Sequence, residues 1–302
     1  PLCPTATSDC NSGTVTGYTE YVYEAVITLP ANCDDWVFTY CENARNSIID
    51  VINSPGSQDL CVQTGINNLD APCNNSPTFS NQPVSFVCAN TPYCMNPGAV
   101  DPEGDSLVYS MIVPLETPAG GTVTYTPPYG PNNPLPTTAG GPFTLNPQTG
   151  DICFTASGPI VSVMAVRVDQ YDAAGNWIGF IIRDMQVNVS NCTNENPTLL
   201  GFDGNPIDPS GSNTALEICP GDVINEIINA TDPNDVGPDL TLTWNASIPG
   251  ATFVDNGDGT ATFNWVPGPG DIGTTQCFTV TVEDDQCPYI GSNTNSYCIT
   301  IN

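Results

Sequence analysis

The sequence lacks histidine and lysine altogether, and its only basic side chains are Arg45, Arg167 and Arg183. Because 32 acidic residues stand against these three arginines, the formal net charge is −29. Such a chain repels phosphate backbones and anionic membrane surfaces, so we expect neither a nucleic-acid partner nor membrane binding. The usual general bases and nucleophiles are missing, and among so many carboxylates no single pair stands out as a glycosidase site. The sequence therefore predicts that the protein is not an enzyme.

Long apolar runs and helical periodicity are also absent. No stretch approaches the ~20 apolar residues of a membrane-spanning helix, and no window keeps a 3.6-residue apolar period. Residues 1–4 have neither the basic start nor the apolar run of a signal peptide, from which we expect a mature form or a fragment. Proline (30) and glycine (27) are abundant instead, and they separate many short segments as in all-β proteins. One such segment, residues 20–29, is apolar on both alternating faces and predicts a strand at the centre of a sandwich.

The last third of the chain repeats its middle. An Asp-Pro pair follows a cysteine by thirteen residues twice, from Cys88 to Asp101 and from Cys219 to Asp232, and an alternating apolar strand comes next both times. An ordered repeat that continues in two further stretches, 143–157 with 253–267 and 163–179 with 277–291, predicts tandem domains of one fold. We expect three units in a row: an N-terminal β domain at 1–77, an immunoglobulin-like sandwich at 78–193, and an immunoglobulin-like or cadherin-like sandwich at 194–302.

The fourteen cysteines divide evenly among these units, as disulfides closed within domains require. No CxxC pair and no histidine exist to build a zinc site, so we predict disulfides and an oxidising, extracellular location. Cys277 and Cys298 lie on strands that flank one loop, and they should face each other across an antiparallel pair. The other expected bridges rest mainly on proximity or elimination: Cys3–Cys10, Cys33–Cys41, Cys61–Cys73, Cys88–Cys94, Cys153–Cys192 and Cys219–Cys287.

Acidic side chains gather in the loops that follow the repeated aspartates. Calcium takes six to eight oxygen ligands, which two such loops and backbone carbonyls can supply. The same residues also populate turns simply because Asp and Asn bond their own backbone, so both explanations stay open. The candidate calcium ligands are Asp101, Glu103, Asp105, Asp169 and Asp172 in the second unit, and Asp232, Asp235, Asp239, Glu283, Asp284 and Asp285 in the third.

Several stretches carry a resemblance to a known family: residues 67–110, TGDICFTAS at 149–157 and RDMQVNVSNC at 183–192. They resemble the large repetitive surface proteins of Bacteroidota, labelled gliding-motility-associated and secreted by the type IX system. The third unit, with TFNWVPGPGDIG and FTVTVEDDQCPY, is similar to their cadherin-like or immunoglobulin-like repeats. The resemblance implies a bacterial cell-surface location and a structural role. It also implies Ser106 as a candidate O-glycosylation site, since Asp105-Ser106-Leu107 matches the acceptor pattern of these bacteria.

The leading expectation is a non-enzymatic structural module of an extracellular bacterial surface protein or adhesin. One alternative is a subunit of a homopolymeric filament built by strand exchange at sheet edges. Another is an adhesin domain that binds glycans or proteins. The expected partners are accordingly neighbouring domains, copies of the same protein, or glycans and surfaces, with calcium as the one candidate cofactor.

Overall fold

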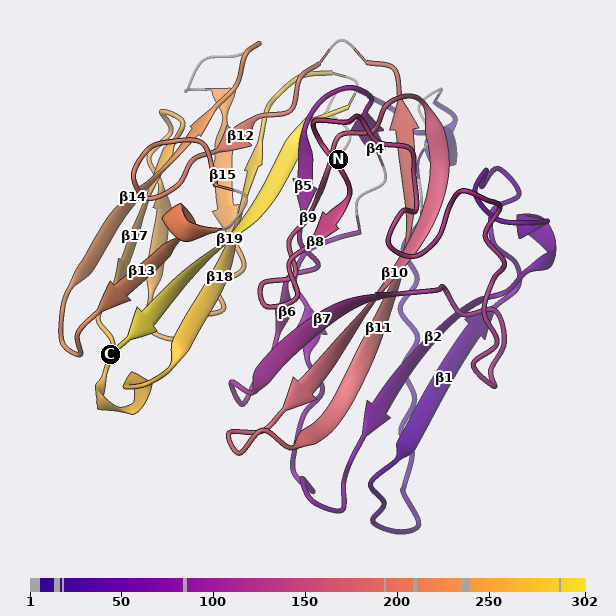
Figure 1. The fold of residues 1–302 in the computed structure, drawn as a ribbon, viewed down its shortest axis with the longest axis horizontal. Coiled ribbons are helices and arrows are strands. Elements are labelled where there is room, and N and C mark those ends of the chain that lie inside the picture. The colour runs from indigo at the N-terminus through magenta and orange to yellow at the C-terminus, as the bar shows by residue number, and fades with distance from the viewer. Residues whose placement is uncertain are drawn as a thin grey trace.

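The computed structural model describes residues 6–13, 17, 19–83, 86–192, 194–208, 211–234, 239–287 and 289–302. Two β-sandwiches lie side by side and splay apart toward one end (Figure 1). The predicted all-β class is confirmed, because the helical elements in the described part are single 3-10 turns. These are Asp9–Asn11, Pro55–Ser57, Ser212–Thr214 and Pro269–Asp271.

The second sandwich has the Greek-key strand order of an immunoglobulin-like domain. One sheet contains, in order, β12 (Thr198–Leu199), β14 (Ile224–Thr231), β17 (Thr260–Trp265) and β16 (Thr252–Asp255). The facing sheet contains β13 (Ala215–Ile218), β19 (Ser292–Ile301), β18 (Thr275–Glu283) and β15 (Thr241–Trp244). Between them, the Phe263 and Phe278 rings stack 4.3 Å apart at the centre of the core.

The first sandwich repeats this pairing scheme strand by strand. The pair β3 (Thr78–Phe79) and β6 (Ala99–Val100) corresponds to β12 and β14. The set β5 (Tyr93–Met95), β9 (Ile152–Phe154) and β8 (Thr144–Leu145) corresponds to β14, β17 and β16. The set β4 (Phe86–Cys88), β11 (Trp177–Ser190), β10 (Ile160–Tyr171) and β7 (Ser106–Ile112) corresponds to β13, β19, β18 and β15. Asp101 and Asp232 each follow the strand that pairs with the first strand of their sandwich, so they occupy equivalent places.

Strands from residues 1–77 extend the sheet of the first sandwich. β1 (Trp36–Glu42) pairs with β2 (Leu60–Ile66), and β2 pairs with β11 through Ile66 and Gly179. One continuous sheet, β1-β2-β11-β10-β7, therefore crosses the boundary expected at residue 77. A glycine permits the join, because a Cβ at Gly65 would meet the ring of Phe180 on β11.

Residues 20–29 differ from the sequence-based prediction. They were expected to form a central, buried strand, but the backbone there is not part of any sheet, and every side chain except that of Leu29 is exposed. Tyr21, Val22, Tyr23, Val26 and Ile27 are 61–102% exposed.

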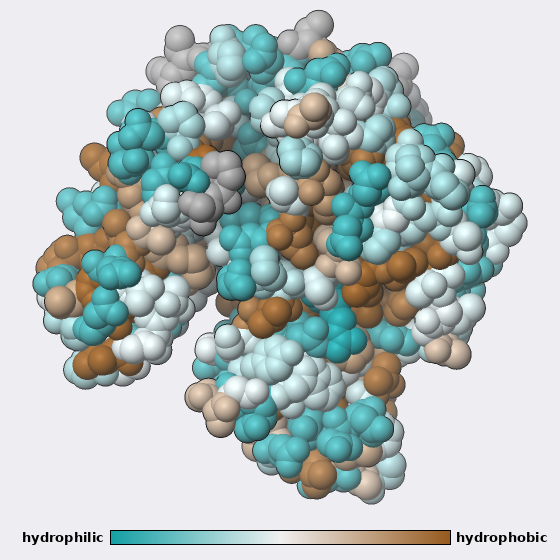
Figure 2. Space-filling view, in the orientation of Figure 1, coloured by the Kyte–Doolittle hydropathy of each residue, from teal (hydrophilic) through white to brown (hydrophobic). Residues whose placement is uncertain are grey.

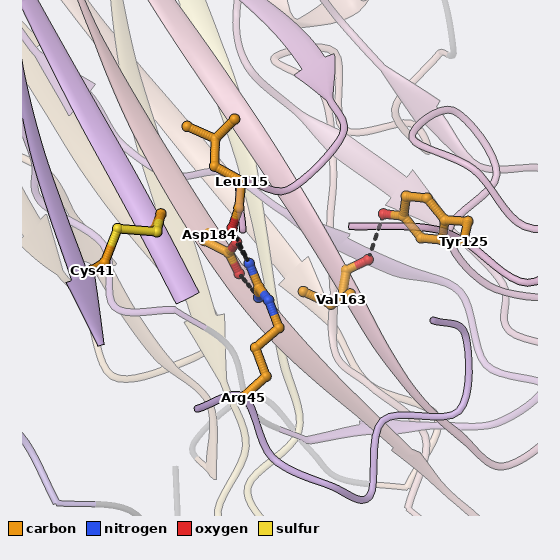
Figure 3. Close-up of polar contacts among 7 residues, drawn as sticks. Cys41, Arg45, Leu115, Tyr125, Val163 and Asp184 are labelled. Atoms are coloured by element: carbon orange, nitrogen blue, oxygen red, sulfur yellow. Dashed lines mark hydrogen bonds and ion pairs between the residues drawn. A yellow bond between two sulfur atoms is a disulfide. The ribbon is translucent and has the colours of Figure 1, made fainter. Parts of the chain in front are cut away.

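A buried ion pair between Arg45 and Asp184 joins the segment between β1 and β2 to β11 (Figure 3). The Arg45 guanidinium donates to both carboxylate oxygens of Asp184 on β11, at 2.9 and 2.6 Å, and to the carbonyl of Leu115 at 2.9 Å. The two charged side chains are only 1% and 2% exposed. Nearby, the Tyr125 hydroxyl donates to the carbonyl of Val163 at 2.8 Å. The segment between β1 and β2, which contains Arg45, and the segment after β7, which contains Leu115 and Tyr125, are thereby held against β10 and β11.

The disulfides follow strand register rather than sequence proximity. Cys41 and Cys61, Cys94 and Cys153, and Cys277 and Cys298 are directly opposed on antiparallel neighbours, and each pair is bonded. Cys88 on β4 bonds to Cys192 just beyond β11. The bridge predicted from strand pairing, Cys277–Cys298, is confirmed.

The bridges predicted from proximity or elimination are wrong. Cys88–Cys94 and Cys153–Cys192 exchange partners, because Cys94 and Cys153 face each other across β5 and β9. Cys33–Cys41 and Cys61–Cys73 are replaced by Cys41–Cys61. Cys10 and Cys219 carry free thiols, which excludes Cys3–Cys10 and Cys219–Cys287; Cys3 itself lies outside the described residues.

The two sandwiches meet through a polar interface between β19 and the β5–β9 region. The backbone N–H of Cys94 donates to Asn293 Oδ1 at 2.6 Å. Asp151 accepts the Ser296 hydroxyl at 3.0 Å and the Ser296 N–H at 3.2 Å, and Asn96 donates to both side chains. Burial raises the pKa of the Asp151 carboxyl despite these hydrogen bonds.

Candidate cation site

The loop between β6 and β7 brings three carboxylates together in the first sandwich. One oxygen from each of Asp101, Glu103 and Asp105 lies within 4.8 Å of the others. Asp101 Oδ1 folds this loop by accepting the N–H groups of Glu103 and Asp105, at 3.0 and 2.9 Å. Burial raises the pKa of Asp101, and burial together with the charge of Asp101 raises the pKa of Asp105. The loop therefore brings two half-buried carboxylates, Asp101 and Asp105, together with the exposed carboxylate of Glu103.

Gln170, near the end of β10, fills the space between these carboxylates. Its side chain is fully buried. Its amide nitrogen lies 2.5 Å from Asp101 Oδ2, 3.2 Å from Asp105 Oδ2, and 3.1 Å from both Asn74 Oδ1 and the Asn75 carbonyl. An amide nitrogen has only two hydrogens, so four surrounding oxygens compete for them. An amide thus occupies the centre of an oxygen cluster that would otherwise attract a cation.

Asp284 takes the place of Gln170 in the second sandwich, because Val168-Asp169-Gln170 matches Val282-Glu283-Asp284 in the repeat. Asp284 is 5% exposed, and it accepts Asn194 Nδ2 at 2.6 Å and the Gly291 N–H at 2.8 Å. Burial, with a smaller contribution from the charge of Asp232, raises the pKa of its carboxyl.

Asn194 corresponds to Asn74, since both begin an Asn-x-x-Pro-Thr stretch that leads into the first strand. The buried Asn194 Oδ1 accepts no hydrogen bond from the part of the chain that the structure describes. Asp232 Oδ1 accepts the N–H of Asn234 at 2.6 Å, so the loop after β14 turns as the loop after β6 does. Among the described residues, the second site thus combines carboxylate and amide oxygens with the Asn194 amide nitrogen, and a carboxylate, Asp284, stands where the first site has Gln170.

A glycine makes room for the central side chain in both sandwiches, on the last strand of the first and directly before the last strand of the second. Gly179 lies opposite Gln170 in the β10–β11 register, and a Cβ there would come 3.3 Å from Gln170 Oε1. A Cβ at Gly291 would come 2.4 Å from Asp284 Oδ2. The two sites are therefore built on the same backbone plan.

Some predicted ligands lie away from these clusters. Asp169 pairs with Arg167 at 2.6 Å and accepts Trp177 Nε1, because neighbouring residues of a strand face opposite sides. Asp172 closes the β10–β11 turn, where the Asn176 amide lowers its pKa. Glu283 matches Asp169 in the repeat, and Asp239 and Asp285 are exposed. Asp235 lies outside the described residues, and Ser106 is exposed at the start of β7.

Sequence reasoning missed the uncharged members of both sites. Gln170, Asn74 and Asn194 carry no charge, so a search for acidic clusters passes over them. The repeated Asn-x-x-Pro-Thr stretch was the available signal, because it recurs at the same distance before the first strand of each sandwich.

No protein-family model matches the chain, and no curated protein sequence does either. Among solved structures, it is similar to the EC3-6 cis-dimer of protocadherin gammaB7, with 14% identity over 75% of this chain and 47% of that chain and a TM-score of 0.26. It is similar to tandem immunoglobulin domains of titin, with 8% identity, 76% and 98% coverage and a TM-score of 0.25. It is also similar to an endo-fucoidan hydrolase of glycoside hydrolase family 107, with 12% identity, 88% and 38% coverage and a TM-score of 0.27.

The chain spans 26%, 47% and 45% of the first three structures that it matches. At these identities and TM-scores the likenesses carry no argument about function. Within the described ranges, no helix has the length and apolar character that would let it cross a membrane.

Proposed function

We propose that this chain is a non-enzymatic structural module of an extracellular bacterial surface protein. The observation that carries the proposal is the coupling of two immunoglobulin-like sandwiches through the polar interface at Asp151 and Ser296. Cross-strand disulfides in both sandwiches support an oxidising location outside the cytoplasm. The resemblance to Bacteroidota surface proteins supports the bacterial surface as that location.

Surface labelling of intact source cells with an antibody against the chain tests this proposal. Staining without permeabilisation is the expected result. Staining that requires permeabilised cells would contradict a surface role. Glycan-array binding tests the alternative of a glycan-binding adhesin domain.

We further propose that the second sandwich takes up calcium beside Asp284. A buried carboxylate, the carboxylate of Asp232 and the amide oxygen of Asn194 supply hard oxygen ligands there. In the first sandwich, the Gln170 amide nitrogen lies at the corresponding centre. We therefore expect calcium binding at one of the two equivalent positions.

Calorimetric titration of the chelator-treated protein measures this difference. One site with a dissociation constant of about 10⁻⁴–10⁻³ M is expected, as in other extracellular modules. Asp284→Asn should abolish the binding heat, whereas Asp285→Asn, at the exposed neighbour, should leave it unchanged. The absence of both heat and a melting shift at about 10 mM calcium would end the calcium proposal and leave the structural role standing.

A further inference from the structure

Residues 20–29, which we call the donor segment, have the composition of a strand but no sheet to join. Five of the ten side chains are large, apolar and at least 61% exposed, and Val26 is 102% exposed. A strand that is apolar on both faces is normally covered on both. On the face that Figure 2 draws, apolar side chains occur in small patches among polar ones. The donor segment therefore exposes apolar surface that its own fold does not cover.

The backbone of the donor segment is unpaired as well. Among the described residues, no backbone group of 20–29 makes a hydrogen bond. The one ring contact recorded for the segment joins Tyr23 to Tyr40 on β1, with centroids 5.0 Å apart. Unpaired backbone groups beside apolar side chains favour addition to an open sheet edge.

The outer edge of β1 is such an open edge. β1 pairs with β2 on one side over all seven of its residues, and the described residues provide no partner on the other side. Figure 1 shows β1 at the margin of its sheet. Val37 and Tyr40 on this strand are 50% and 40% exposed.

The other sheet margins are shorter or partly covered. On β7, the N–H of Tyr109 donates to the carbonyl of Pro147. On β15, the N–H of Leu242 donates to Asp255. β16 is only four residues long. The edge of β1 therefore offers the longest uncapped ladder for an added strand.

We propose that the donor segment of one molecule adds as a strand to the outer edge of β1 in a second copy of this chain. Each copy carries both the segment and the edge, so the chain is complementary to itself. Within one molecule, residues 30–35 connect the donor segment to β1, and hydrogen bonds hold this connection in place. The Cys33 N–H donates to Asn68 Oδ1, and the Cys33 carbonyl accepts the N–H groups of Asn68 and Leu69. The Ala31 carbonyl accepts Trp36 Nε1. Among the described residues, the segment meets its own β1 through the rings of Tyr23 and Tyr40 and makes no backbone pair with it.

The area available is sufficient for a stable contact. A docked aromatic side chain buries about 150–250 Å². In a reciprocal exchange, each of two copies would bury two tyrosines and three aliphatic side chains against the β1 edge of the other. The total buried area then exceeds the ~1,000 Å² of a specific interface. Reciprocal exchange gives a dimer, and one-way exchange gives a filament.

Charge opposes this association and makes it dependent on salt. The segment carries Glu20 and Glu24, the edge ends at Glu42, and the whole chain has a net charge of −29. Screening by salt weakens repulsion between exposed charges, so the association should strengthen as ionic strength rises. The inference deepens the filament alternative to the proposed function, and its failure would leave the calcium site and the structural module unaffected.

Analytical ultracentrifugation of the full chain, from micromolar to several hundred micromolar and from low to high salt, measures the association. We expect oligomers whose dissociation constant falls with salt. Ala25→Pro/Val26→Pro should weaken association at least ~10-fold, because one of two adjacent prolines must remove a ladder N–H. Val26→Ser should also weaken it. Val254→Ser, which alters an exposed valine on β16, is the matched control and should not.

A photocrosslinker in place of Tyr21 identifies the surface that the segment meets. With mixed ¹⁵N-labelled and unlabelled chains, we expect adducts between different molecules at residues 36–42. The proposal is overturned by a monomer at every concentration and salt, by association that ignores the double proline variant, or by adducts confined to one molecule or to another surface. Circular dichroism confirms that the variants fold.

Discussion

Gln170 and Asp284 show how one position in a repeated fold can carry opposite electrostatic demands. Gln170 directs an amide N–H₂ at Asp101 and Asp105 and so offsets their charge within the protein. Asp284 adds a buried carboxylate near Asp232 instead, and the pKa of Asp284 is raised. The first site therefore has an amide N–H₂ among its carboxylates, whereas the second has a further carboxylate at the same position.

A single substitution should make the first site resemble the second, which has a carboxylate at the position of Gln170. Gln170→Glu replaces the central N–H₂ with an oxygen among four other oxygens, so it should destabilise the fold by about 2–4 kcal/mol. Part of this loss should return in millimolar calcium, because a cation can then occupy the centre of the cluster. Urea denaturation with and without calcium measures both effects.

The matched control is Gln148→Glu, which places the same new charge on an exposed side chain. It should change the unfolding free energy by no more than about 0.5 kcal/mol, with or without calcium. If Gln170→Glu behaved like this control, the Gln170 amide would not be offsetting the carboxylates around it.

At the scale of strands, the disulfides differ mainly in the length of chain that they close. Cys88–Cys192 encloses a separation of 104 residues, whereas Cys41–Cys61 in the same sheet encloses only 20. Loop-closure entropy predicts that replacing Cys88 and Cys192 with alanine costs about 1.5 kcal/mol more than replacing Cys41 and Cys61. Equilibrium unfolding in urea compares the two double variants. Cys73→Ala removes an exposed free thiol and should leave stability unchanged, and equal losses in the two double variants would contradict the entropic argument.

The strands also show which features sequence patterns can and cannot predict. The repeat around Asp101 and Asp232 predicted two equivalent sandwiches, because turns and the alternation of apolar and polar side chains depend on residues that are close together in the sequence. The pairing of Ile66 with Gly179 was not predicted, since it joins residues far apart in the chain. The bridge Cys277–Cys298 was found by reasoning about strand neighbours, and the bridges assigned without that reasoning are wrong. The carboxylates of the candidate site were visible in sequence, but Gln170 at its centre was not.

At the scale of the whole molecule, the excess of acidic groups makes stability depend on pH. The pKa values of Asp101, Asp105, Asp151 and Asp284 are raised in the folded state, chiefly by burial. A carboxyl with a raised folded pKa binds more protons in the folded than in the unfolded state. The free energy of unfolding therefore falls as pH rises from 3.8, the ordinary pKa of an aspartate, through the higher pKa of the folded state. The lowered pKa of Asp172 acts in the opposite direction, but that carboxylate lies in a solvent-facing turn where screening weakens its effect.

We therefore expect the melting temperature to be higher at pH 5 than at pH 7.5, by about 3–6 °C. Repulsion among exposed carboxylates and desolvation of buried carboxyls both contribute to this difference in melting temperature, and their dependence on salt distinguishes them. Repulsion among exposed carboxylates is screened at high ionic strength, whereas desolvation of buried carboxyls is not. Scanning calorimetry in calcium-free buffer at both pH values, in low and in 0.5 M salt (roughly a 4 Å Debye length), should thus show a smaller but persistent difference in salt. Asp151→Asn should reduce the persistent part, because an amide at the sandwich interface does not titrate. A difference that vanished in salt would assign the whole effect to surface charge, and a melting temperature that rose with pH would refute the role of the buried carboxyls.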